Sequence, residues 1–275
     1  MKKQISILVV LIFLLASTIY AQELNPSNRT KSDLKLIRKI LISMNSKSEV
    51  MGQDMENNMK STTVYNIDIN ATTEQGATAE IKTTAIKMET ESMGQEMSYD
   101  SEKPEEGNRE IAAQSKDIMK NIMKITLDAN GFITSVKGNE KLTPIKNDAE
   151  NKYQKGEFFD VFLKLTKAVK PGDSWEEKDE KKDYKTNSKI TYKSFENGIA
   201  NIEKISTVII DQKIEQMGMI MFSTLEGTVV ETIEVDPSTL LIKSRTTISN
   251  LKGYVDARGT KMPLTSFMTT SETIQ

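Results

Sequence analysis

Apolar residues recur at every second position over much of this chain, and this period constrains the fold more than any other feature. The alternation runs through Tyr65–Asn70, Met123–Leu127, Tyr184–Tyr192 and Leu240–Ile248. Successive side chains of a β-strand point to opposite faces, so each segment is predicted to be a strand with one apolar and one polar face. Strands of this kind belong to antiparallel sheets that have one solvated face.

Turn-forming residues separate these runs. Asp128–Gly131 and Glu196–Gly198 each contain Asn-Gly, a pair that tolerates positive φ, and both predict β-hairpins. Asp236–Thr239 predicts a further turn. The alternation slips by one residue near Thr84, which predicts a β-bulge. Leu34–Met44 fits either a strand or a helix period, and its Ile content and β-rich surroundings favour a strand.

Two segments follow a helical period instead. Ile111–Ile122 and Phe158–Val169 each place apolar residues on one helical face, and the second is predicted to end at Lys170–Gly172. The second segment carries three of the eight Phe residues, so we expect it to cover the concave side of a sheet. The predicted fold class is α+β and mainly antiparallel β, with a strongly curved, half-barrel-like sheet and two or more helices on its concave face.

The N-terminus has the layout of a secretory signal peptide. Lys2 and Lys3 precede the apolar run Ile5–Ala16, and the small residue Ala21 is the expected cleavage point. The run is too short to cross a bilayer, which takes about 20 apolar residues. We therefore expect an exported protein, periplasmic or extracellular, that does not span a membrane after cleavage.

The expected domain organisation follows from these patterns. Residues 1–21 form the signal peptide, 22–33 a flexible leader and 34–275 one β-rich domain. The order of strands, helix and strands allows two similar halves, 34–146 and 147–275.

Composition excludes several kinds of chemistry. The chain has no Cys and no His, so disulfides, thiolate or imidazole metal ligands and a Ser-His-Asp relay are all excluded. The net charge of −2 argues against a nucleic-acid partner. No pair of carboxylates can be located for acid–base catalysis, and we expect no enzyme, no metal and no cofactor.

Methionine is unusually frequent, with 15 residues. Met51, Met55 and Met59 are spaced by four, and a second group, Met217 to Met221, by two. Thioethers can bind Cu(I), but Met is more often an adaptable apolar residue that lines a core or a groove. We therefore predict an apolar ligand groove, and its predicted wall residues are Met88, Met119, Met123, Phe158 and Phe162.

Three short segments carry a resemblance to a known family. Met93–Ser101, Asp128–Gly138 and Lys170–Trp175 resemble an uncharacterised family of bacterial envelope proteins, many of them lipoproteins, catalogued only as a domain of unknown function. The resemblance implies an envelope location and transfers no active residue. The chain lacks the Cys of lipidated members. The expected pattern of strands and helices is also remotely similar to the half-barrel of periplasmic lipoprotein carriers.

The sequence thus favours an exported, non-enzymatic envelope protein that binds a lipid or another hydrophobic small molecule in an apolar groove. The alternative is an envelope interaction or structural module with a fully packed core and a protein partner. An enzyme ranks third, because it needs a carboxylate pair that converges in a pocket.

Overall fold

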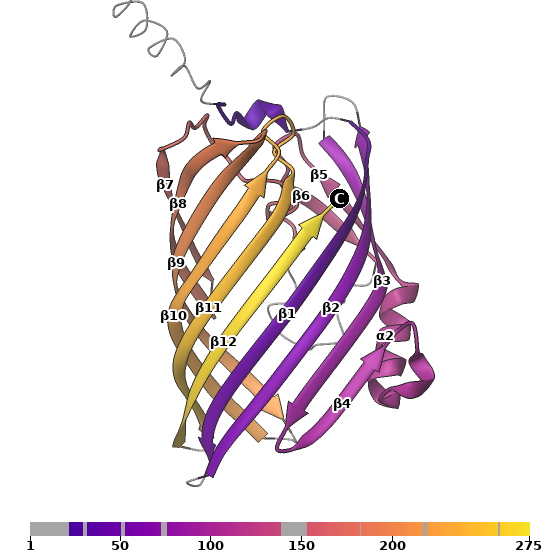
Figure 1. Cartoon of the computed structure of the whole chain (residues 1–275), viewed down its shortest axis with the longest axis vertical. Helices are drawn as coiled ribbons and strands as arrows, with labels where there is room; N and C mark the ends of the chain where they lie inside the picture. The colour runs from indigo at the N-terminus through magenta and orange to yellow at the C-terminus, as the bar shows by residue number, and fades with distance from the viewer. Residues whose placement is uncertain are drawn as a thin grey trace, which may run out of the picture.

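One antiparallel sheet organises the chain (Figure 1). The structure is a computed structural model that describes residues 22–29, 32–50, 53–72, 76–138, 153–181, 183–216, 219–257 and 259–275. The predicted signal peptide, residues 1–21, therefore lies outside the described residues, as do Met51 and Met217.

The described residues form a 12-stranded sheet with the order β6-β5-β3-β2-β1-β12-β11-β10-β9-β8-β7, and β4 also pairs with β3. The strands are β1 (Leu34–Val50), β2 (Gln53–Thr72), β3 (Gly76–Ser92), β4 (Gln95–Asp100), β5 (Ile122–Leu127), β6 (Ile133–Lys137), β7 (Ser174–Lys181), β8 (Tyr184–Glu196), β9 (Ile199–Gln216), β10 (Met219–Val235), β11 (Ile242–Ala257) and β12 (Thr260–Ile274). The first and last strands pair, so both predicted halves belong to one sheet, and the sheet is not closed.

The local strand predictions are confirmed. The chain turns between β5 and β6 and between β8 and β9 at the two predicted Asn-Gly hairpins. Val64 pairs with Ala85 and Tyr65 with Thr83, so Thr84 is the extra residue of the predicted bulge. Leu34–Met44 lies in β1, as its Ile content indicated.

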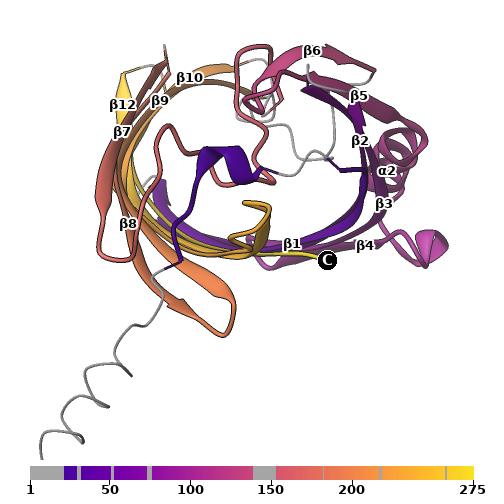
Figure 2. The same ribbon diagram turned by 90° about the horizontal axis from the view of Figure 1, so that it is seen from above.

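The predicted class of α+β with two or more helices on the concave face is wrong. The described residues contain one α-helix, α2 (Arg109–Lys120), and two short 3-10 turns, η1 (Pro26–Asn28) and η3 (Pro104–Glu106). Helix α2 lies beside β3, outside the ring seen in Figure 2, and its Ile118 packs against Ile86 and Tyr99. Within the described part of the chain, no helix is long and apolar enough to cross a membrane.

The second predicted helix, Phe158–Val169, is an irregular segment. The structure buries Phe159, Val161, Leu163 and Leu165, which alternate, together with Phe162 and Val169 from the predicted helical face, so burial follows no single period. Its backbone groups pair mainly with other segments, and one hydrogen bond, from Phe162 N–H to the Phe159 carbonyl, lies within it. Phe159 N–H donates to the Gly131 carbonyl, and Leu163 N–H donates to the Leu240 carbonyl.

The main core fills the concave side of the sheet near one end. Seen from above, the curved sheet surrounds η1, the irregular segment and the β10–β11 turn (Figure 2). Leu24, from the predicted flexible leader, is fully buried and forms a β-bridge with Val169, so this part of the leader packs against the core. The hydroxyl of Tyr192 donates to the Gln22 carbonyl at 2.9 Å, and burial raises the pKa of Tyr192 to about 12.

A buried ion cluster ties the irregular segment to the sheet. Arg38, on the concave face of β1, is 2% exposed and donates both Nη atoms to the Asp160 carboxylate, at 2.8 and 3.1 Å. Arg38 Nη1 also donates to the Tyr153 hydroxyl at 2.7 Å. Its Nε lies 3.0 Å from Glu272 Oε1 in β12, an ion pair whose angle is too poor for a hydrogen bond.

Neighbouring groups keep Arg38 protonated. Burial opposes the charge of Arg38, but Asp160, Tyr153 and Glu272 outweigh that cost, so the pKa of Arg38 lies well above its usual value. Arg245 in β11 adds a second cation, 3.6 Å from Glu272 and 3.9 Å from Asp160. Removal of Arg38 would therefore leave the buried Glu272 carboxylate and the partly buried Asp160 carboxylate with only Arg245 to offset them.

We predict that Arg38→Met lowers the free energy of unfolding by about 3–5 kcal/mol, because it leaves buried carboxylates without their main partner. Chemical denaturation of the two proteins measures the difference. Lys47→Met is the matched control, because Lys47 and Glu56 form an exposed ion pair and its loss should cost less than about 1 kcal/mol. Equal losses for the two variants would contradict a structural role of the buried cluster.

Candidate functional site

A cavity of about 540 Å³ lies near one end of the sheet. It is bounded by the ends of β2 and β3, the β5–β6 turn, η1 and the irregular segment. Its apolar lining residues are Pro26, Ile69, Ala71, Ala77, Leu127, Ala129, Phe132, Phe158, Phe162 and Leu165. This size falls in the range of about 300–1,000 Å³ that is common for small-molecule sites. We call it the end cavity.

Arg29 supplies a cation at the wall of the end cavity. Its Cζ lies 4.9 Å from the centroid of the Phe158 ring, within cation–π range. Its Nε is buried and has no hydrogen-bond partner. Burial lowers the pKa of Arg29, and the carboxylate of Asp128 works in the opposite direction. Asp128 offsets part of the charge of this guanidinium, and an anion in the cavity would provide a further partner.

The β5–β6 hairpin builds the opposite wall. Asp128 Oδ1 accepts hydrogen bonds from the backbone N–H groups of Asn130 (2.8 Å) and Phe132 (2.9 Å), which fixes the turn. Phe132 then meets Phe158 edge to face, with ring centroids 5.5 Å apart. Lys164 Nζ lies 5.9 Å from the Phe132 ring centroid and adds a second cation to the lining.

Gly131 is the residue that lets these groups approach. Its φ of +82° is unfavourable for any residue with a side chain, and an added Cβ would lie 3.1 Å from both Arg29 Nε and a ring carbon of Phe158. The Asn-Gly pair that predicts the hairpin therefore also leaves room for the guanidinium.

The structure brings together only two of the five predicted wall residues. Phe158 and Phe162 line the end cavity. Met123 is 2% exposed within the main core. Met88 faces Tyr99 across β3 and β4, and Met119 packs beside Ile118 on α2, so both belong to the region around the second, smaller core.

Arg29, Phe132 and Lys164 were not predicted as site residues. Arg29 falls in the segment expected to be a flexible leader, and a single Arg there has no periodic or motif signal. Phe132 follows the predicted hairpin turn. It lies next to Phe158, which is 26 residues away in the sequence, so only the tertiary structure brings the two together.

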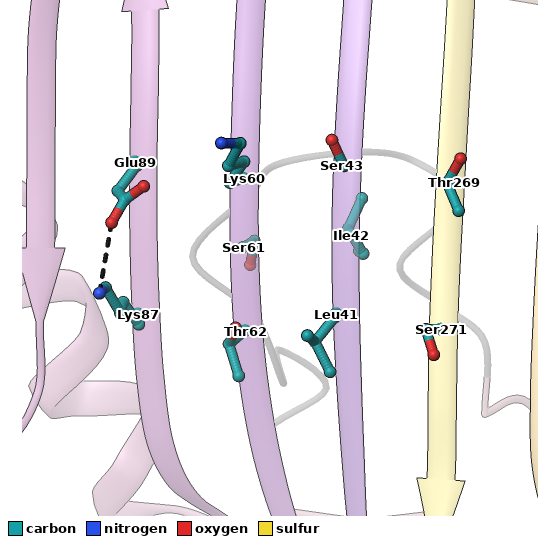
Figure 3. Close-up of a pocket in the computed structure, with 10 residues that line it drawn as sticks. All are labelled: Leu41, Ile42, Ser43, Lys60, Ser61, Thr62, Lys87, Glu89, Thr269 and Ser271. Carbon is teal, nitrogen blue, oxygen red and sulfur yellow. Dashed lines mark ion pairs between the residues drawn. The ribbon is translucent and has the colours of Figure 1, made fainter.

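A second hollow, of about 340 Å³, lies on the convex face of the sheet (Figure 3). Side chains of four adjacent strands form it, and its one ion pair joins Lys87 and Glu89 at 3.3 Å. Leu41, Ser43 and Lys60, which line it, are all exposed. It lacks both the aromatic wall and the buried cation of the end cavity, and we do not regard it as the ligand site.

Acidic residues do not assemble a metal site in the described part of the chain. No group of three or more His, Cys, Asp or Glu side chains gathers there in an arrangement that could hold an ion.

Comparison of sequences with family models identifies one match. A family of unknown function (DUF6263) matches residues 74–164 and 145–242, a range that includes all three segments on which the predicted resemblance rests. The predicted resemblance to a family of unknown function is thereby confirmed. No curated protein matches the chain in sequence.

Solved structures show only distant likeness. A lipovitellin structure, titled for lipid–protein interactions, has a TM-score of 0.45 and 15% identity over 88% of this chain, which spans 25% of the lipovitellin chain. DynF from the dynemicin pathway of Micromonospora chersina has a TM-score of 0.25 and 8% identity, over 88% of this chain and 81% of its own. An outer membrane channel from Pseudomonas putida F1 has a TM-score of 0.24 and 6% identity, over 89% and 96%.

We predict that Gly131→Ala destabilises the protein more than Gly172→Ala. Both glycines have positive φ, so either substitution should cost about 1–2 kcal/mol in backbone strain. Only at Gly131 does the new Cβ also press on Arg29 and Phe158, while nothing lies within 4 Å at Gly172. The additional cost should be about 1–3 kcal/mol in urea denaturation. Equal costs would show that Arg29 is not packed against this turn.

Proposed function

The chain belongs to this family of unknown function, and we propose that it is an exported, non-enzymatic protein that binds an amphiphilic small molecule in the end cavity. The apolar part of the ligand would lie against the aromatic wall, and its anionic head group would meet Arg29. The observation that carries this proposal is a cavity with an apolar wall next to a half-buried guanidinium whose buried Nε has no hydrogen-bond partner.

The energetics favour an amphiphile over a fully polar ligand. Burial of hydrocarbon contributes about 0.8 kcal/mol per CH₂, so a few methylene groups against Phe158 and Phe162 suffice for measurable binding. A guanidinium recognises carboxylate and phosphate through charge-assisted hydrogen bonds, which are stronger than neutral ones. Lys164 adds positive charge to the lining, and Asp128 is its acidic member.

Export is the second part of the proposal, and it rests on the N-terminal sequence. Cleavage after Ala21 would leave Gln22 as the first residue. The structure is consistent with a chain that starts there, because the Gln22 carbonyl accepts the Tyr192 hydrogen bond and Leu24 is already in the core.

A second candidate function is an interaction module in the envelope. The sheet ends at β6 and β7, and an outer strand can pair with an extended segment of a partner. Most residues of β7 are exposed and charged, which protects such an edge from indiscriminate pairing.

We predict that the purified protein binds a long-chain fluorescent fatty acid and that Arg29→Met weakens this binding about ten- to a hundredfold. Loss of one charge-assisted hydrogen bond costs about 1.5–3 kcal/mol, and 1.4 kcal/mol corresponds to a factor of ten. Affinity for the matching fatty alcohol, which has no charge, should change little. Fluorescence titration measures both. Arg109→Met, on the exposed start of α2, is the control and should leave both affinities unchanged.

The contrast between acid and alcohol separates the alternatives. If the wild-type protein binds neither compound, and a pull-down from envelope extracts recovers a protein partner, the interaction module replaces the ligand carrier. If Arg29→Met lowers the affinity for the fatty acid and for the fatty alcohol equally, the guanidinium shapes the cavity and does not recognise a head group.

We also predict that the protein recovered from cells that express the full chain begins at Gln22. N-terminal sequencing or intact-mass measurement checks this, and Ala21→Leu, which spoils the small residue at the cleavage point, should slow processing. A recovered chain that retains residues 1–21 would contradict the export proposal.

A further inference from the structure

A row of methionines crosses the concave face of the sheet, away from the end cavity. Met44 in β1 lies directly opposite Met59 in β2 and directly opposite Met268 in β12. Arg38 and Met44 have the same parity in β1, so these three side chains point to the concave side, as Arg38 does. All three are half-buried. We call them the methionine row.

The three thioethers are close enough to share one ligand. Directly opposed residues of an antiparallel pair have Cβ atoms about 4.5–5.5 Å apart, so Met44 sits between two neighbours at this distance. A Met side chain has three rotatable bonds beyond its Cα. The sulfur atoms of the outer two residues can therefore turn toward that of Met44.

Most side chains around the methionine row are polar, whereas methionines in an apolar core have apolar neighbours. The next inward-facing positions on one side are Ser61, Ile42 and Thr270, and those on the other side are Asn57, Ser46 and Ser266. At the two ends, Met59 is opposite Thr90 and Met268 is opposite Ser249. The Thr90 hydroxyl oxygen is buried and has no hydrogen-bond partner. Apart from Ile42, the neighbours of these thioethers are therefore hydroxyl and amide side chains.

We propose that the methionine row is a binding site for a soft monovalent cation, with Cu(I) as the natural ion and Ag(I) as its analogue. Thioether sulfur is a soft, uncharged ligand, and soft ligands select Cu(I) over hard cations such as Mg²⁺ or Ca²⁺. Glu89 and Glu91 in β3 pair with Lys60 and Asn58, which have the opposite parity to Met59, so these two carboxylates face the convex side. On the concave face of β12, Glu272 already pairs with Arg38. The inward-facing neighbours named above therefore offer the row no carboxylate that would favour a hard divalent ion.

Thioether ligands predict how the Cu(I) affinity of the row depends on pH. Metal sites built from Cys or His must lose protons before they bind, so their affinity falls in acid. A thioether carries no proton to lose. Binding of Cu(I) to the methionine row should therefore be nearly constant between about pH 5 and pH 8. This site is separate from the end cavity, so its test does not depend on whether the end cavity binds an amphiphile.

The test is an anaerobic titration of the full mature chain with Cu(I) in competition with a coloured Cu(I) chelator. We expect one Cu(I) per chain and a sulfur-only first shell in the X-ray absorption spectrum of the copper. Met44→Leu keeps the volume and removes the central sulfur, so it should weaken binding at least tenfold. Met268→Leu serves as a second variant, and circular dichroism verifies the fold of each.

A control variant locates the site. Met93→Leu removes an exposed sulfur at the β3–β4 turn and should leave Cu(I) affinity unchanged. The proposal is overturned if the wild-type chain takes no Cu(I) from the chelator. It is also overturned if both row variants bind as tightly as the wild type, or if oxygen or nitrogen atoms dominate the first shell.

Discussion

The pairing of Arg38 with Asp160 and Glu272 is the interaction on which the rest of the architecture depends. A sheet this strongly curved leaves a concave side that must be filled near its end, and the chain fills it with a segment that has no regular secondary structure. Such a segment has few backbone hydrogen bonds of its own to hold it. Asp160 of this segment pairs with the buried Arg38 guanidinium on β1, and Glu272 on β12 pairs with the same guanidinium, so the segment has one position instead of many.

That position determines the candidate site. With Asp160 held, Phe158 and Phe162 on the same segment face the ends of β2 and β3, and the hairpin at Asp128–Gly131 brings Phe132 against Phe158. Arg29 then lies over an aromatic face and is partly removed from water. The end cavity is therefore formed by four segments distant in sequence, and the ion cluster and the hairpin set its dimensions.

Sequence patterns predicted the strands well and the site only in part. Alternation and Asn-Gly pairs located β5, β6, β8 and β9, and the one-residue slip located the bulge at Thr84. The same method failed at Phe158–Val169, where apolar residues satisfy both periods and only pairing with Leu24 and Leu240 decides between them. Two of the cavity residues, Phe158 and Phe162, were predicted for their aromatic character, while Arg29 had no local signal.

The sequence by itself determined the alternation of faces, the positions of the turns and the absence of His and Cys chemistry, because each of these depends on neighbouring residues or on composition alone. Tertiary structure decided which methionines meet. Spacing along the chain grouped Met59 with Met51 and Met55, whereas the register places it beside Met44 and Met268. Register is a relation between strands, set by the pairing of the whole sheet, and it decides which distant side chains become neighbours.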